Sequence, residues 1–225
     1  MRLRPSGRSG PLATHIEGFV AYQEREAWTW EHMALTRARV VSGSPAFAAR
    51  IEASIRHAIR RKRDASAVAA DVVEMRGAIA AEKGDADPWD LKYATGGLID
   101  IEFIAQYLQL VHAASAPEIL DTSTARMLEK ASRAGILKPE EAAVLRPAVL
   151  LFHDLTQILR LCLPGAFDPS VFDPSAFAPK SANAGVLTLL ARAADLPDFP
   201  ALQAHVVETQ RAVRESFVRI FGKAP

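Results

Sequence analysis

The chain has one cysteine in 225 residues, few aromatic residues (7%) and no excess of either charge. A single cysteine, Cys162, excludes an internal disulfide and offers no cysteine set for a metal site. Its apolar neighbourhood, residues 159–163, favours a buried structural thiol over a nucleophile. With 27 Lys or Arg against 26 Asp or Glu, the chain lacks the net charge of a disordered protein, and we expect it to fold.

Long apolar runs are also absent. No uninterrupted run approaches the ~20 residues of a membrane span, and the basic N-terminus lacks the apolar segment of a signal peptide. We therefore expect a cytoplasmic protein with no membrane partner. Hydrophobic residues make up 49% of the chain, which is enough for one substantial core or two small ones.

The near-zero net charge hides an asymmetry along the sequence. Residues 1–63 hold 12 Lys or Arg against 5 Asp or Glu, whereas residues 64–225 hold 15 against 21. A basic segment can meet phosphates or an acidic protein. Because Arg60–Arg63 directly follows a helical pattern, a solvated helix end is the favoured interpretation of that cluster, and we expect no nucleic-acid partner.

Apolar residues at three- and four-residue spacing predict helices along nearly the whole chain beyond residue 10. Thr14 with Glu17 forms a capping-box pattern for a helix to about residue 25. Ser44 before a first-turn proline and Asp64 before an alanine-rich segment mark two more starts. No strand alternation persists past Arg4, so the predicted fold class is all-α, a bundle of about seven to eight helices. Further predicted helices cover 28–41, 97–114, 121–135 and 139–163, the last with a kink at Pro147.

The first ten residues suggest an anion site. Arg2 and Arg4 precede a proline that favours extended backbone, where residues two apart share a face. The Ser6–Gly10 segment supplies small residues whose backbone amides and hydroxyls can approach a phosphate closely. A simple turn after a strand is the alternative, and the pattern alone favours it.

Two further groups of residues invite a functional interpretation. Arg37 and Arg39 follow an aromatic stripe on a predicted helix, where a guanidinium can fork onto a carboxylate or phosphate. Asp100 and Glu102 lie in an otherwise apolar helix opened by Gly96-Gly97. A dipole-capping role is sufficient for Asp100, because it lies in the first helical turn. For Glu102, which continues into a polar stripe, a structural network and an active-site wall remain equal alternatives.

Five short motifs occur in order: Arg-Leu-Arg-Pro-Ser-Gly-x-Ser-Gly at 2–10, Ala-Trp-Thr-Trp-Glu-His at 27–32, Arg-Ala-Arg at 37–39, Glu-Met-Arg at 74–76 and Gly-Gly-x-x-Asp-Ile-Glu-Phe-Ile at 96–104. In order and spacing they resemble the C-terminal, adenylylating half of bacterial glutamine synthetase adenylyltransferase, the bifunctional adenylyltransferase and adenylyl-removing enzyme. The resemblance covers essentially the whole chain.

The resemblance implies a nucleotidyltransferase domain followed by a helical domain, which together move AMP from ATP onto a tyrosine of glutamine synthetase under control of glutamine and the PII signalling protein. Carboxylates there hold Mg²⁺. This chain lacks them, as if it began inside the catalytic domain. We therefore expect residues 1–13 to be a remnant strand and loop of the missing nucleotidyltransferase domain, 14–225 to be the helical domain with a possible sub-boundary at 83–95, and the isolated chain to be inactive.

The resemblance also implies roles for particular residues. Those expected to border the nucleotide are Arg2, Arg4, Ser6, Gly7, Ser9 and Gly10. Those expected at the catalytic cleft are Arg37, Arg39, Lys92, Asp100 and Glu102. No metal ligand is expected in this chain, and ATP and Mg²⁺ are expected only in the complete enzyme.

Two other interpretations stay open. The chain could be a non-catalytic module that binds glutamine synthetase or PII, which its charge asymmetry would suit. It could also be the helical part of the related PII uridylyltransferase, although that family would be expected to carry a hydrolase region and regulatory domains downstream.

Overall fold

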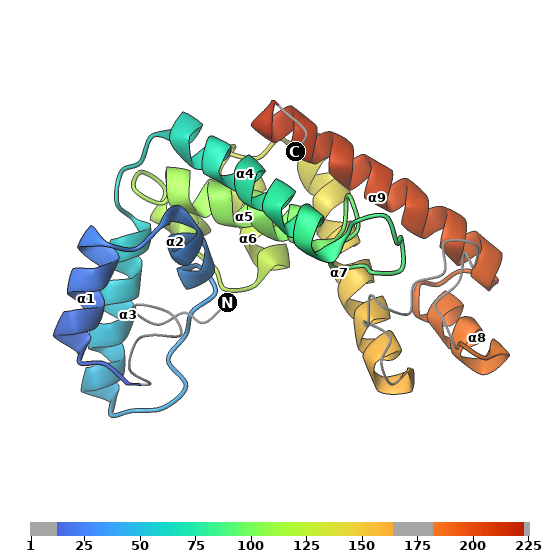
Figure 1. The fold of residues 1–225 in the computed structure, drawn as a ribbon, viewed down its shortest axis with the longest axis horizontal. Helices are drawn as coiled ribbons and strands as arrows, with labels where there is room; N and C mark the ends of the chain where they lie inside the picture. The colour runs from blue at the N-terminus through green and yellow to red at the C-terminus, as the bar shows by residue number, and fades with distance from the viewer. Residues whose placement is uncertain (1–12, 164–181, 223–225) are drawn as a thin grey trace. The chain divides into compact units, whose positions relative to one another are not determined.

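The structure, a computed structural model, describes residues 13–163 and 182–222. Within these residues it contains nine α-helices, one short 3₁₀ helix and no strand, which confirms the all-α prediction (Figure 1). The count is one more than the upper end of the expected seven to eight. The predicted N-terminal strand and loop lie almost wholly outside the described residues. The helices are α1 (Ile16–Arg25), α2 (Thr29–Leu35), α3 (Pro45–Ile59), α4 (Ala65–Lys83), α5 (Leu98–His112), η2 (Pro117–Ile119), α6 (Thr124–Arg133), α7 (Pro139–Cys162), α8 (Ala184–Ala193) and α9 (Phe199–Phe221).

Side-chain caps fix several of these starts. The Ser44 hydroxyl accepts the Phe47 N–H at 3.4 Å, and an Asp64 oxygen accepts the Ser66 N–H at 2.9 Å, which confirms both predicted starts. The Thr14 prediction is wrong. The N-cap of α1 is His15, which makes no side-chain cap hydrogen bond, so the helix begins without the expected reciprocal box.

The second helix ends six residues earlier than predicted, at Leu35 instead of 41. The Thr36 hydroxyl donates to the Met33 carbonyl at 2.7 Å, and the next backbone N–H groups bond three residues back, Arg37 to Ala34 at 3.2 Å. Such bonds tighten and terminate a helix. Arg37 therefore lies beyond the helix rather than on its stripe.

The described chain divides into two compact units. One contains the described residues up to Val72 together with Ala105–Ile136, and the other contains Val73–Ile104 and the described residues from Leu137 onward. Two of the three divisions fall inside α4 and α5, and the third falls between α6 and α7. The expected single domain over 14–225 and its boundary at 83–95 stay predictions.

In the first unit α1 and α2 both pack on α3 (Figure 1), and η2 packs on α6. Met33 of α2, Ile55 and Ile59 of α3 and Met127 of α6 are buried. In the second unit α7, α8 and α9 pack on one another. Apolar side chains from all three helices are buried there, among them Leu145, Phe152, Leu190, Val213 and Phe217.

Helix α7 bears on the expectation that the chain has no membrane-spanning segment. Although uninterrupted apolar runs are short, α7 as a whole is long and apolar enough to cross a membrane by length and composition alone. In the structure one face of α7, including Val149 and Leu155, is buried, while Leu150 and Leu161 are exposed. The core helix of a soluble protein has the same composition. Cys162, at its end, is only partly buried, so the predicted burial of this thiol is incomplete.

Candidate functional site

The Asp100 carboxylate is completely buried near the start of α5. One oxygen accepts a short hydrogen bond from Arg76 Nε, and the other accepts the Gly96 N–H at 2.8 Å. Arg214 Nη1 of α9 lies 3.6 Å from the same second oxygen. A buried carboxylate is tolerated only with such partners. Asp100 therefore ties α4, α9 and the turn before α5 together within one unit.

Arg76 is itself buried and extends the network to the loop before α5. Its Nη2 donates to the carbonyls of Tyr93 and Ala94 at 3.1 and 3.3 Å and lies 4.0 Å from an Asp85 oxygen. Its Nη1, like that of Arg214, is buried without a hydrogen-bond partner. The guanidinium thus fixes the backbone of residues 93–94, which is a positioning function.

The Gly96-Gly97 pair is required by close packing. Gly96 has φ of +75°, and a Cβ there would lie 1.9 Å from the Gln210 carbonyl oxygen of α9. At Gly97 a Cβ would lie 2.7 Å from the Leu91 carbonyl oxygen. Gln210 Nε2 also donates to the Pro88 carbonyl at 2.7 Å. The loop and α9 therefore meet backbone to backbone, which only glycine permits.

Lys92 lies on this fixed loop, half-buried, with its Nζ 4.8 Å from the Tyr93 ring centroid. An Asp90 oxygen accepts the N–H groups of Lys92 and Tyr93 at 3.3 and 3.2 Å. Burial raises the pKa of Asp90 despite these hydrogen bonds. Trp89 stacks on Phe199 of α9, with 5.2 Å between ring centroids. The loop is thus held at both its backbone and its side chains.

Glu102 is half-buried on α5, two residues after Asp100. Farther along the same helix Gln106 and Gln109 are buried, and Gln109 Oε1 accepts the Asp121 N–H at 3.2 Å. The end of the predicted polar stripe therefore belongs to a structural network. The catalytic roles of Asp100 and Glu102 stay predictions.

The predicted site residues are thus divided between the units. Lys92, Asp100 and Glu102 belong to the second unit, whereas Arg37 and Arg39 are exposed and belong to the first. All six residues expected to border the nucleotide, between positions 2 and 10, lie outside the described residues. Sequence reasoning missed Gln210 and Arg214 because they lie more than a hundred residues from the motif they fasten. Arg76 stood in the Glu-Met-Arg motif, which was the available signal.

The Ala-Trp-Thr-Trp-Glu-His motif forms a second buried polar cluster in the first unit. Glu31 is 3% exposed, and its oxygens accept the Tyr22 hydroxyl at 2.8 Å and the Trp28 N–H at 2.9 Å. His32 Nε2 lies 3.0 Å from the Gln23 carbonyl oxygen, which agrees with a structural histidine. Burial, and then the nearby Arg63 and Arg61, lower the pKa of His32.

Two arginines of the predicted solvated cluster have defined partners in the same unit. Arg61 Nη1 donates to the carbonyls of Gln23 and Glu24 at 3.2 and 3.1 Å. Arg63 donates to the carbonyls of Ala58 and Ile59, both at 2.7 Å. These guanidinium groups satisfy carbonyls at the C-terminal ends of α1 and α3, so the cluster is more than a solvated helix end.

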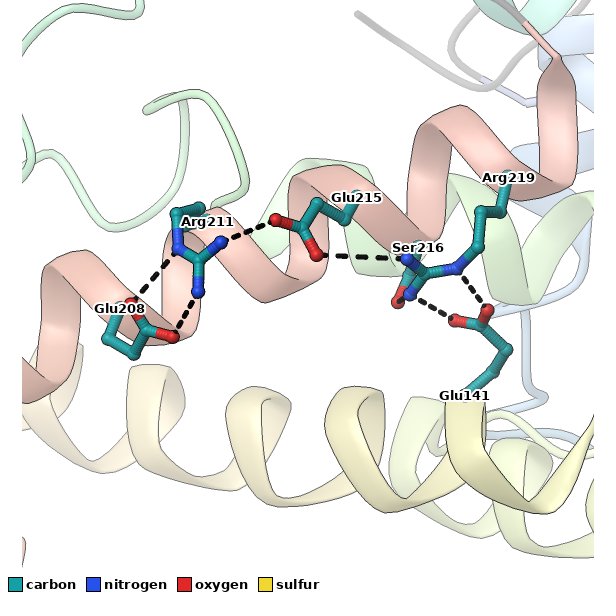
Figure 2. Close-up of polar contacts among 6 residues, drawn as sticks. All are labelled: Glu141, Glu208, Arg211, Glu215, Ser216 and Arg219. Carbon is teal, nitrogen blue, oxygen red and sulfur yellow. Dashed lines mark hydrogen bonds and ion pairs between the residues drawn. The ribbon is translucent and has the colours of Figure 1, made fainter.

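A chain of ion pairs lies along α9 in the second unit. Figure 2 shows Arg211 between Glu208 and Glu215, with contacts of 3.0 and 2.7 Å. Figure 2 also shows Arg219 between Glu215 and Glu141 of α7, at 3.7 and 2.6 Å. All these side chains except Glu141 are about half exposed or more. We call these five residues the α9 ladder.

Among the described residues, no three His, Cys, Asp or Glu side chains gather in a way that could hold a metal ion. These residues therefore do not fit Mg²⁺ by themselves.

Two family models match the chain. Residues 1–54 match the family described as glutamate-ammonia ligase adenylyltransferase, and residues 48–163 match the family described as GlnD PII-uridylyltransferase. Among curated proteins, the chain is 59% identical over 223 residues to the bifunctional glutamine synthetase adenylyltransferase/adenylyl-removing enzyme of Bradyrhizobium sp. (strain ORS 278), which covers 99% of this chain and 22% of that protein. The chain belongs to the glutamine synthetase adenylyltransferase family.

Other members of the adenylyltransferase family agree. The enzymes of that same name from Rhodopseudomonas palustris (strain BisB5) and Xanthobacter autotrophicus (strain Py2) are 57% and 50% identical over 99% and 100% of this chain. The chain spans about a fifth of the length of these relatives, 21% and 22%. The helical segment 48–163, about half of the chain, is of the type that the uridylyltransferase model describes.

Proposed function

We propose that this chain is the helical part of an enzyme that transfers AMP from ATP to a tyrosine of glutamine synthetase. The observation that supports this most is the identity of 50–59% over 99–100% of the chain with relatives named for adenylylating and de-adenylylating glutamine synthetase. In this proposal, ATP and Mg²⁺ bind mainly to residues outside this chain. The complete enzyme works in the cytoplasm and responds to the PII protein.

The role of the second unit in this function is to present the fixed loop before α5. Arg76 and Asp100 hydrogen-bond to the backbone of the loop, and Arg214 lies beside Asp100. Gln210 of α9 donates to the Pro88 carbonyl of the same loop. A side chain held in this way loses little conformational entropy when it meets a ligand, so fixed geometry favours binding and catalysis. Lys92 and Glu102 are the residues that we propose to face the reacting groups.

The first experiment tests whether the chain acts alone. The purified chain is incubated with glutamine synthetase, ATP and Mg²⁺, and AMP incorporation is measured. We expect none above background. The positive control is a chimera in which this chain replaces the aligned part of the Bradyrhizobium enzyme. Robust Mg²⁺- and ATP-dependent transfer by the isolated chain would refute the supporting role.

The second experiment tests the residues. In the chimera, Lys92→Ala and Glu102→Ala are expected to lower the rate of AMP transfer by about tenfold or more. Leu161→Ala is the matched control, because Leu161 is in the same unit and 85% exposed. Turnover that is intact in both variants would remove these residues from the site.

A second candidate function is docking without chemistry. The charge difference between the first 63 residues and the remainder favours it. The isolated chain would then retain glutamine synthetase or PII in a pull-down, and retention would weaken as salt rises because exposed charges are screened. A part in PII uridylylation is supported only by the match of residues 48–163, and relatives that cover the whole chain carry the adenylyltransferase name.

A further inference from the structure

Trp28 is 71% exposed, although it stands in the Ala-Trp-Thr-Trp-Glu-His motif. The chain has three tryptophans; Trp30 is half-buried and Trp89 is 5% exposed. A large indole left in water loses the stabilisation that its burial would give. An exposed tryptophan on a folded surface is also the residue type most enriched at the energetic centre of protein interfaces.

The backbone that carries Trp28 is held firmly. Its N–H donates to the buried Glu31, which also accepts the Tyr22 hydroxyl from α1. The next residue, Thr29, donates a short hydrogen bond to Asp71 of α4. These contacts fix the start of α2 against two other helices, so docking a partner there requires little further ordering of backbone.

The two family models overlap at residues 48–54, inside α3. The adenylyltransferase model covers residues 1–54 and thus all of α1 and α2, whereas the uridylyltransferase model begins at residue 48, inside α3. Yet α1 and α2 pack on α3 in one unit. By sequence these two helices fall under the adenylyltransferase model, whereas by packing they belong with α3, most of which falls under the uridylyltransferase model.

We propose that Trp28 anchors the adenylyltransferase module, by which we mean the part of the complete enzyme that lies outside this chain, to the helical chain. This inference rests on the proposed function. In the relatives nearly four fifths of the polypeptide lies outside the matched segment. The partner that we propose for Trp28 is therefore part of the same polypeptide in those relatives. In this proposal α1 and α2 connect the two parts, because they pack on α3 and Trp28 inserts into the module.

Charge defines the partner surface further. Residues 13–63 hold nine Lys or Arg against five Asp or Glu. The exposed charged residues just before Trp28 are Glu24, Arg25 and Glu26, and Arg61 donates to the Glu24 carbonyl. The complementary surface is therefore an apolar pocket for the indole with a polar rim that carries both charges.

The test compares Trp28→Ala, Trp28→Phe and the control Leu161→Ala in the chimera with the Bradyrhizobium enzyme. Leu161 is 85% exposed, against 71% for Trp28, and belongs to the other unit. For Trp28→Ala we expect AMP transfer to fall about tenfold or more and protease cleavage between the module and this chain to accelerate by a similar factor. Trp28→Phe should recover most of both, and Leu161→Ala should change neither.

The same substitutions in the isolated chain distinguish docking from folding. We expect Trp28→Ala to leave its Tm unchanged within about 2 °C, because an exposed side chain contributes little to the fold. A clearly lower Tm would make Trp28 a structural residue and overturn the proposal, as would unchanged proteolysis in the chimera. If the unmodified chimera transfers no AMP, the proposed function fails, while the proteolysis comparison still decides the docking.

Discussion

Two groups of charged residues in the second unit use the same chemistry in different surroundings. Arg76, Asp100 and Arg214 form a cluster whose carboxylate is fully buried, whereas most of the α9 ladder is half exposed or more. Helix α9 contributes to both, with Arg214 on one side and Arg211 on another. A buried and an exposed arginine–carboxylate contact can therefore be compared on a single helix.

The difference lies in what replaces water. In the α9 ladder each charge keeps much of its hydration, so pairing adds little. In the buried cluster Arg76 and Asp100 have lost their hydration, and each depends on the other and on backbone groups of the loop. Burial converts an ordinary ion pair into a determinant of loop geometry.

The largest expected effect is that of Asp100→Asn. Removing the charge leaves the buried Arg76 guanidinium without its closest counter-charge, with Asp85 remaining at 4.0 Å, so the free energy of unfolding should fall by about 3–5 kcal/mol. Urea unfolding of the chain measures it. In a double-mutant cycle with Arg76→Met, the second substitution should cost much less than it does alone. Additive losses would show that the two residues act independently.

Gly96→Ala should have the next largest effect. The new Cβ would strain a positive φ and collide with the Gln210 carbonyl oxygen, which together cost about 3 kcal/mol. Gly135→Ala is the matched control, because Gly135 has φ of +70° with nothing within 4 Å of its Cβ position. It should cost about 1 kcal/mol. Equal losses in the two variants would mean that the approach of α9 contributes nothing.

Part of the fold can be predicted from local sequence signals. Local signals succeeded where a contact spans a few residues: the Ser44 and Asp64 caps and the apolar α5 are as expected. The end of α2 was missed because a single hydroxyl, that of Thr36, competes with the helical pattern.

The candidate site was predictable only in part. The motif at 96–104 indicated Asp100. Because the helix dipole is a sufficient local explanation for an acid in the first turn, no sequence signal gave a reason to expect Arg76 as its partner. Gln210 meets Gly96 across 114 residues, a separation at which periodicity carries no information. Which side chains face a ligand depends on such packing, so Lys92 remained one residue among several.

A smaller effect should appear at the buried end of the α9 ladder. Burial raises the pKa of Glu141, but hydrogen bonds from Arg219 and Ser216 outweigh it and leave that pKa below its ordinary value of 4.5. A depressed folded-state pKa stabilises the fold above the unfolded pKa, and the gain is lost as pH falls through the folded one. Glu141→Gln should cost roughly 1 kcal/mol at pH 7 and nothing in strong acid. Unfolding curves from pH 7 to 2 measure this, and a constant difference would contradict it.

The smallest effect should come from Arg211→Ala, in the middle of the α9 ladder. Arg211 bonds both Glu208 and Glu215, but all three side chains are about half exposed or more, and pairing them restricts long flexible side chains. The Tm of the variant should stay within about 2 °C of the parent, with a difference that shrinks further in 1 M salt. Arg214→Ala, one turn away on the same helix, should lower the Tm several-fold more because it faces the buried Asp100. If the two substitutions lower the Tm equally, burial is not what separates the two groups of charges.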